Sequence, residues 1–113
     1  MAGRLPGAII TDLDGTLTPS LVTALNLQDK PVFVSTWRGS DAHRHTREEL
    51  SKMGLKYQGL FMRPQSSDEA PGPFKQRVLR DLQKRWTIVL AIDDDPTVCN
   101  MYRSEHIRVW EIK

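Results

Sequence analysis

The sequence predicts one α/β domain, a parallel sheet with helices on both faces. Three observations lead to this prediction. Segments of strand and helix character alternate along the 113 residues, as in sheets built with crossover helices. The strand-like segments are compact apolar runs rich in β-branched residues. Acidic, hydroxyl and basic residues follow these runs directly, at the edge where such sheets bind ligands.

Two short buried strands are predicted in the first third of the chain. Residues 8–11 and 32–35 are apolar runs of the length and composition that short strands have. Residues 20–27 between them are also partly apolar, but so short a stretch does not distinguish a helix from a strand. We therefore leave the form of this connecting segment open.

A helix and a third strand are predicted in the middle of the chain. Thr46 and Glu49 have the spacing of a capping box, in which two side chains bind backbone N–H groups at a helix start. A helix over residues 47–53 follows, and Gly54 stands where helices commonly end. The apolar residues 60–62 are expected to form the third strand.

Two further helices and two further strands are predicted in the second half. Turn-forming residues make 64–73 a loop. Residues 74–84 have apolar side chains at helical spacing and basic ones on the other face. The continuous apolar run 86–92 is the strongest strand pattern. A proline in the first turn indicates a helix over 96–103, and the alternating residues 106–112 predict an edge strand.

The size and composition of the chain favour a small cytoplasmic domain. One modest core is possible in 113 residues and two are not, so we expect residues 1–113 to form a single domain. No apolar run approaches the roughly 20 residues that cross a bilayer, and residues 1–7 do not resemble a signal peptide. We therefore expect no membrane partner. The single cysteine, Cys99, excludes an internal disulfide and fits a reducing compartment.

Two carboxylates one residue apart follow the first predicted strand. Asp12 and Asp14 belong to the string Asp-Leu-Asp-Gly-Thr-Leu. Carboxylates are rarely placed at the edge of a core unless they pair or bind a cation. Mg²⁺ takes carboxylate oxygens, water and substrate phosphate as ligands, and a carboxylate beside it can attack phosphorus. For a bare Asp-x-Asp, the structural alternative is an Asx turn.

This string resembles the first motif of the haloacid dehalogenase superfamily, whose members are mostly Mg²⁺-dependent phosphatases. The resemblance implies that Asp12 is the nucleophile that forms an aspartyl-phosphate. It implies that Asp14 is the general acid for the leaving oxygen and then the base that activates water. Thr16 would brace the loop and help to bind the substrate, and Gly15 would allow the sharp turn.

The second and third motifs of the superfamily also have candidates in the expected order. Thr36 matches the hydroxyl residue that holds a phosphoryl oxygen, and Ser35 is the alternative if the strand ends one residue earlier. Arg38 would then bind phosphate or substrate, while Trp37 stands where the pattern usually has glycine. Lys75 matches the lysine that pairs with the nucleophile and with the negatively charged phosphoryl group.

The fourth motif is matched by the apolar run that ends in Asp93 and Asp94. Adjacent carboxylates repel one another unless a cation neutralises them. The resemblance implies that one of the two completes a Mg²⁺ site with Asp12 and the backbone carbonyl of Asp14, and that the other orients the lysine. Which of the two binds the metal is left open. Asp95 is placed to cap the next helix.

The motif spacing indicates a member of the superfamily without a cap domain. About twenty residues separate the first two motifs and about forty separate the second from the lysine, too few for an inserted domain. Capless members have open sites and generally act on phosphates attached to macromolecules. The local sequence is similar to the 3′-phosphatase domain of phage-type polynucleotide kinase. The matching residues are 12–17, 36–38, Thr46, Met62 and Arg63, Lys75, 92–94, Val98, Met101, Tyr102, Arg103 and 107–110.

This resemblance implies that Arg63 binds substrate. The chain departs from that subfamily in lacking an arginine between Asp14 and Arg38. It also has no P-loop, so no kinase activity is expected. His43 and His45 lack the further ligands of a zinc site and are expected to be exposed at a helix entrance, where contact with a nucleic-acid backbone is the functional alternative.

We therefore predict a Mg²⁺-dependent phosphomonoester hydrolase whose favoured substrate is a nucleic-acid 3′-phosphate or a nucleotide. The net charge of +2 does not by itself argue for nucleic acid. Basic residues gather in 38–47 and 77–85, as solvated helix faces or as substrate contacts. The alternatives are a phosphatase for small metabolites or phosphoproteins and a non-catalytic binding module. The oligomeric state is open.

Overall fold

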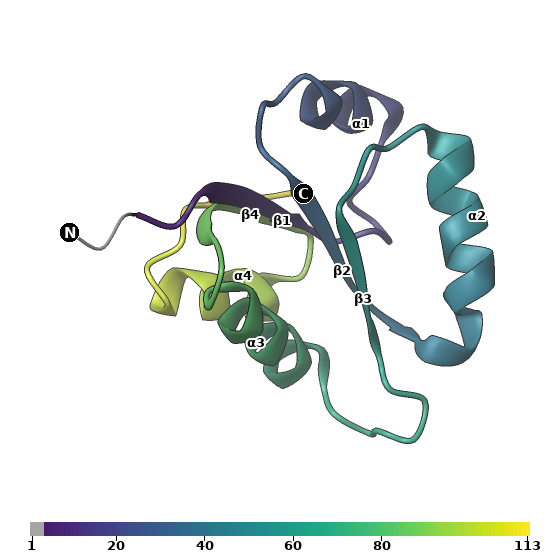
Figure 1. Ribbon diagram of the computed structural model, residues 1–113. Coiled ribbons are helices and arrows are strands. Elements are labelled where there is room, and N and C mark those ends of the chain that lie inside the picture. Colours follow the sequence, from purple (N-terminus) through teal and green to yellow (C-terminus); the bar gives the residue numbers. More distant parts are fainter. Residues whose placement is uncertain (1–3) are drawn as a thin grey trace.

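The computed structural model describes residues 4–113 and shows a five-stranded parallel sheet between two layers of helices (Figure 1). The predicted α/β fold with helices on both faces is therefore confirmed. In chain order, the elements are β1 (Gly7–Thr11), α1 (Pro19–Asn26), β2 (Val32–Gly39), the one-turn helix η1 (Ser40–Ala42), α2 (His43–Met53), β3 (Gly59–Arg63), α3 (Pro71–Leu82), β4 (Thr87–Asp93), α4 (Pro96–Ser104) and β5 (Val109–Glu111).

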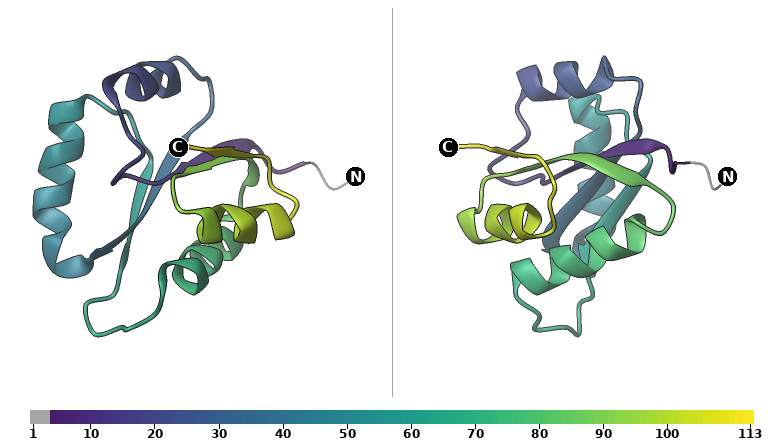
Figure 2. Two further views of the ribbon diagram at one scale, coloured as in Figure 1. Left: turned by 180° about the vertical axis from the view of Figure 1, so that it is seen from behind. Right: turned by 90° about the vertical axis from the view of Figure 1, so that its left-hand side faces the viewer.

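Each face of the sheet packs against two helices, α1 and α2 on one side and α3 and α4 on the other (Figure 2). Successive residues of a strand point to opposite faces. Ala8 and Ile10 of β1 accordingly share a core with the buried side chains of α3 and α4, whereas Ile9 shares one with those of α1 and α2. Because both faces are buried, the central strands are continuously apolar.

The strand order, β3-β2-β1-β4-β5, places β1 at the centre of the sheet. The chain runs outward from β1 to β2 and β3, and then returns to pair β4 against the other side of β1. The carboxyl ends of β1 and β4 therefore lie side by side, and the backbone N–H of Asp12 donates to the carbonyl of Ile92 at 2.8 Å. Sheets of this kind bind ligands at such a switch point.

Several element boundaries differ from the predicted ones. The segment left open is α1, which begins after the N-cap Thr18 with Pro19 in its first turn. β2 continues to Gly39, past a register shift relative to β3. α3 begins at Pro71, three residues before its predicted start, because a proline is well accommodated in a first helical turn. The last strand is shorter than predicted and consists of the three residues of β5.

The predicted capping box is wrong. α2 begins at His43, and its N-cap residue makes no side-chain cap hydrogen bond. Thr46 and Glu49 instead lie inside the helix, where both bind the guanidinium of Arg38. Arg38 Nη1 donates to the Thr46 hydroxyl at 3.2 Å, and Nη2 donates to the Glu49 carboxylate at 2.9 Å. The spacing of a capping box also places two side chains on one face of a helix. Thr46 and Glu49 bind Arg38 from that shared face of α2.

The connections between the strands contain no cap domain within residues 4–113. Only α1 lies between β1 and β2, and only η1, α2, β3 and α3 lie between β2 and β4. In this part of the chain, none of the helices combines the length and the apolar character that crossing a bilayer requires.

Candidate active site

A pocket of about 250 Å³ lies at the carboxyl ends of β1, β2 and β4. Four separate segments contribute to it: the loop after β1, the second half of β2, the start of α3 and the end of β4. The residues that line it are Asp12, Asp14, Thr36, Trp37, Arg38, Pro71, Lys75, Asp93, Asp94 and Asp95. Candidates from all four predicted motifs are therefore brought together in one pocket.

Lys75 lies between two carboxylates at the bottom of this site. Its Nζ is 3.0 Å from Asp12 Oδ1 and 2.7 Å from Asp93 Oδ2, and all three residues are buried. Buried charges persist when they are paired and hydrogen-bonded in this way. Because two carboxylates share one ammonium group, the cluster carries excess negative charge when both are ionised.

Burial and neighbouring charges both shift the pKa values of Asp12 and Lys75. Burial is the largest influence on Asp12 and raises its pKa to about 7; Lys75 opposes the rise and the charge of Asp93 adds to it. Burial alone would lower the pKa of Lys75, but the two carboxylates outweigh it and the net shift is upward. The two carboxylates thus favour the charged form of Lys75, whereas burial brings the pKa of Asp12 close to neutral pH.

The turn after β1 requires glycine for two reasons. Gly15 has a φ of +74°, in the left-handed region that side chains disfavour, and a Cβ at this position would collide with the carboxylate of Asp94. The next residue, Thr16, is buried, and its hydroxyl lies 3.2 Å from Asp12 Oδ2 and 3.5 Å from Asp94 Oδ1. The two acidic loops thus meet across Gly15 and Thr16.

Three carboxylates are close enough to share a metal ion. One oxygen each from Asp12, Asp93 and Asp94 lies within 4.8 Å of the others. Both oxygens of Asp93 are engaged, Oδ2 by Lys75 and Oδ1 by the backbone N–H of Asp95 at 3.0 Å. Asp94 is exposed, and within residues 4–113 its side chain accepts only the long hydrogen bond from Thr16. The donor set fits Mg²⁺, which prefers carboxylate oxygens, and Asp94 is the less engaged of the two candidates.

The side chain of Asp95 has the predicted capping position. Its carboxylate accepts hydrogen bonds from the backbone N–H groups of Thr97 and Val98, at 2.8 and 3.4 Å, at the start of α4.

Arg38 connects the loop after β1 with α2. It donates to Asp14 through Nε at 2.9 Å and Nη2 at 2.6 Å, and its other hydrogen bonds go to Thr46 and Glu49. A guanidinium has five N–H groups, and these five contacts can use all of them. The hydrogen bonds from Arg38 also hold the pKa of Asp14 below its usual value. In this arrangement Arg38 binds the predicted general acid, and its role as a phosphate clamp stays a prediction.

The other residues predicted to contact the substrate, Thr36, Ser35 and Arg63, lie in three different surroundings. Thr36 lines the pocket, and its hydroxyl accepts the backbone N–H of Arg38 at 3.3 Å. Ser35 is buried outside the pocket lining, and its hydroxyl has no hydrogen-bond partner among the described residues. Arg63 lies against the Trp37 ring, 4.8 Å from its centroid. Its Nε also donates to the backbone carbonyl of Trp37 at 3.3 Å, so Arg63 contacts the pocket wall through Trp37 and does not itself line the pocket.

Two parts of the site were not predicted from the sequence. The sequence does not indicate that α2 binds Arg38, because Thr46 and Glu49, the two α2 residues in contact with it, have the spacing of a capping box. Trp37 stands where the motif usually has glycine, and a tryptophan beside a phosphate motif is itself a signal of the pocket wall that it forms. His43 and His45 are exposed on α2, as predicted, and neither belongs to the carboxylate cluster.

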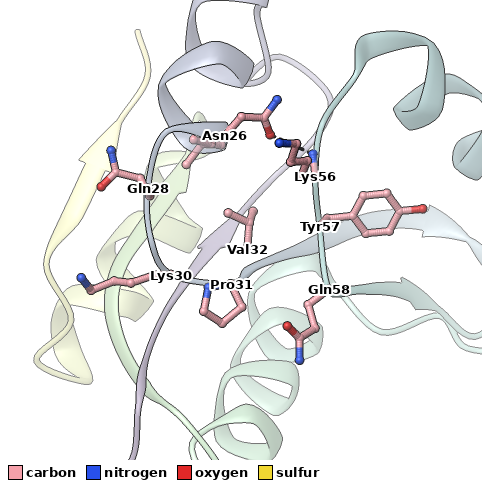
Figure 3. Close-up of a pocket in the computed structure, with 9 residues that line it drawn as sticks. Asn26, Gln28, Lys30, Pro31, Val32, Lys56, Tyr57 and Gln58 are labelled. Carbon is pink, nitrogen blue, oxygen red and sulfur yellow. Dashed lines mark hydrogen bonds between the residues drawn. The ribbon is translucent and has the colours of Figure 1, made fainter.

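A second pocket lies at the opposite, amino end of β2 and has different chemistry (Figure 3). No carboxylate lines it. The amide of Asn26 donates to the carbonyl of Gly54 and accepts from the backbone N–H of Lys56, each at 2.8 Å. These hydrogen bonds tie the end of α1 to the connection after α2, so we assign them a structural role.

Comparison with known proteins supports the assignment of the fold and family. A model of the phosphatase domain of polynucleotide kinase PNKP matches residues 20–113. This range includes Thr36, Lys75 and the acidic residues after β4, while Asp12 and Asp14 precede it. Among curated proteins no relative was found.

Two solved structures contain chains with a similar fold. A chain of the Pnkp1/Rnl/Hen1 RNA repair complex has a TM-score of 0.87 and 22% identity over 98% of this chain and 44% of that chain. A chain of a second Pnkp1/Rnl/Hen1 complex has a TM-score of 0.86 and 22% identity, over 96% of this chain and 46% of that chain. The present chain thus spans less than half of either. Because the PNKP model matches most of its length, the chain belongs to the family of PNKP phosphatase domains in the haloacid dehalogenase superfamily.

Proposed function

We propose that this domain is a Mg²⁺-dependent phosphomonoesterase that works through an aspartyl-phosphate on Asp12. The observation that carries the proposal is the buried cluster in which Lys75 holds Asp12 while the exposed carboxylate of Asp94 stands beside it. A non-catalytic fold has little reason to bury two carboxylates around one lysine. Membership in a phosphatase-domain family supports the same activity.

Each of these residues would have its own role in the reaction. Asp12 attacks phosphorus, and the bond from phosphorus to the ester oxygen breaks as Asp14 gives that oxygen a proton. Lys75 and the hydroxyl of Thr36 hold non-bridging phosphoryl oxygens. Mg²⁺, held by Asp12, Asp94 and the backbone carbonyl of Asp14, would supply positive charge to the phosphoryl group.

Asp14 needs two charge states in this sequence of steps. Arg38 holds it as a carboxylate, which is the form that removes a proton from the water that attacks the aspartyl-phosphate. For the first step, Asp14 has to leave Arg38 and take up a proton. Its side chain is 61% exposed, so it has room to rotate. We infer that Arg38 prepares the base for the second step.

A nucleic-acid 3′-phosphate or a nucleotide is the substrate that we favour. The family is that of polynucleotide kinase phosphatase domains, and the two similar folds occur in RNA repair complexes.

We further propose that residues 1–113 act as one catalytic domain. A reducing compartment would suit the buried free thiol of Cys99. One observation favours a non-catalytic module instead: the ion pair with Arg38 opposes protonation of Asp14.

Phosphate release from a panel of substrates tests this proposal. The panel holds a 3′-phosphorylated oligonucleotide, mononucleotides, sugar phosphates and a phosphopeptide, with and without Mg²⁺. We expect Mg²⁺-dependent release from the oligonucleotide or the nucleotides by the wild type and none by Asp12→Asn. Asp29→Asn is a matched control, because that carboxylate is 91% exposed and far from the site in the fold, and it should retain full activity.

The outcomes distinguish the parts of the proposal. Turnover by Asp12→Asn at the wild-type rate would show that the nucleophile is another group. Release confined to sugar phosphates or the phosphopeptide would keep the mechanism and discard the nucleic-acid substrate. No release from any substrate would favour the non-catalytic module.

A further inference from the structure

Trp37 is a large aromatic side chain in the wall of the candidate active site. It is 43% exposed, although tryptophan is usually well buried. Of the ten residues that line the pocket, only Trp37 and Pro71 are apolar. The other eight carry carboxylate, hydroxyl, ammonium or guanidinium groups. The pocket therefore has a polar part, which suits a phosphate, and an apolar wall, which does not.

The ring of Trp37 is held in a fixed orientation. Its Nε1 donates to the carbonyl of Glu69 at 2.8 Å. The guanidinium of Arg63 lies over the ring, 4.8 Å from its centroid, in the geometry of a cation–π contact. Arg63 is itself fixed, because its Nη1 donates to the carbonyl of Ser67 at 2.6 Å. A ring ordered before binding loses little entropy when a ligand stacks on it.

Anchoring the loop before α3 would explain the hydrogen bond to Glu69 and the contact with Arg63. It would not by itself account for the 43% exposure of Trp37 or for its place in the pocket lining with Asp12 and Lys75. An exposed aromatic surface next to a phosphate site matches a ligand that carries a planar ring close to its phosphate. In a polynucleotide 3′-phosphate, the terminal base is that ring.

We propose that Trp37 stacks on the nucleobase next to the phosphate that is removed. This inference rests on the proposed phosphatase function and deepens it. The substrate class is a phosphate monoester at the 3′ end of a strand whose terminal nucleotide carries a base. Stacking on an aromatic side chain tolerates any base, because every base has a π face. The domain should therefore distinguish nucleotides from base-free sugar phosphates with little preference among bases.

Two oligonucleotides test this role. Both end in a 3′-phosphate and have the same sugar and charge, but the terminal nucleotide has a base in one and is abasic in the other. We expect the wild type to show a KM about 5- to 150-fold lower for the strand with the base. Trp37→Ala should make the two KM values equal by raising only that of the strand with the base, with kcat little changed. Trp37→Phe should keep much of the preference.

Two further variants serve as controls. Trp110→Ala removes a tryptophan that is 51% exposed on β5 and outside the pocket, so it should leave the preference unchanged. If circular dichroism shows that Trp37→Ala does not fold, Trp37→Leu keeps apolar volume without an aromatic face and gives the same comparison.

Each other outcome overturns the inference. Equal KM values in the wild type would exclude stacking and leave the phosphatase proposal intact. An equal loss on both strands in Trp37→Ala would show that the ring only anchors the loop. Preferred hydrolysis of a phosphotyrosine peptide, lost in Trp37→Ala, would identify a different aromatic partner. No release from either strand by the wild type would overturn this inference and the polynucleotide substrate together, and the substrate panel above would then decide whether the phosphatase proposal stands.

Discussion

The charge of Asp12 depends on its burial and on its charged neighbours. Its carboxylate is buried beside Lys75 and Asp93, and its pKa is raised to about 7 in the metal-free protein. A carboxylate binds Mg²⁺ only when it is ionised, so metal binding and proton loss are linked. Below pH 7 the metal has to displace a proton from Asp12, and well above pH 7 the proton has already gone.

The affinity for Mg²⁺ should therefore fall as the pH falls through about 7. Titration calorimetry at pH 6, in two buffers of different ionisation enthalpy, should detect the release of close to one proton per Mg²⁺ bound. At pH 8.5 the release should be near zero. Equal proton release at both pH values would contradict the assignment of Asp12 as the group that titrates.

The sequence predicted many of the residues that line the pocket, but not how their side chains are arranged. Asp12 and Asp14 stand in a string specific enough to be found without a structure. The division between Asp93 and Asp94 could not be predicted, because it depends on side-chain direction at a strand end. Asp93 is the last residue of β4 and points into the buried cluster, whereas Asp94 lies beyond the strand and is exposed.

At the scale of elements, α2 holds the site through Arg38. Thr46 is fully buried in this helix and accepts a hydrogen bond from the guanidinium. Thr46→Val keeps the shape of the side chain and removes the acceptor. Hydrogen bonds to charged groups typically contribute about 1.5–3 kcal/mol, so we expect the free energy of unfolding in urea to fall by roughly that amount.

Thr23→Val on α1 is the matched control. The Thr23 hydroxyl donates to the Pro19 carbonyl on the exposed side of its helix, and surface substitutions usually change stability by at most about 0.5 kcal/mol. If Thr46→Val costs no more than Thr23→Val, the hydrogen bond between Arg38 and Thr46 does not stabilise the fold, and only Glu49 of α2 is left to anchor Arg38.

Most elements could be predicted because they have local signals. The apolar run of β4, the proline that begins α4 and the glycine after α2 each act within a few residues. The predicted capping box is wrong because the same spacing serves a tertiary contact, and spacing alone does not specify which partner a side chain binds. The extension of β2 to Gly39 depends on pairing with β3, which no local pattern reports.

At the scale of the whole molecule, the sheet topology assembles the site from distant parts of the sequence. Thr16 and Asp94 are 78 positions apart and yet share a hydrogen bond, because β4 returns to pair with β1. Alternating strands and helices predict a parallel sheet, but the strand order comes from the structure. The proposed metal ligands lie on both sides of the switch point, so a bound ion would link the two halves of the sheet.

Mg²⁺ should therefore stabilise the whole fold, and Asp94 should be required for the effect. A ligand that binds only the folded chain adds about 2.7 kcal/mol at 100 times its Kd, so Tm should rise with Mg²⁺ at constant ionic strength. Asp94→Asn should unfold at the wild-type temperature without Mg²⁺, because this carboxylate is exposed and weakly bonded, and should show no rise with it. Asp41→Asn, at an exposed aspartate of η1, should keep the full rise. A rise that survives in Asp94→Asn and is lost in Asp93→Asn would reverse the tasks of the two carboxylates, since the ion would then be held by the residue that we assign to Lys75.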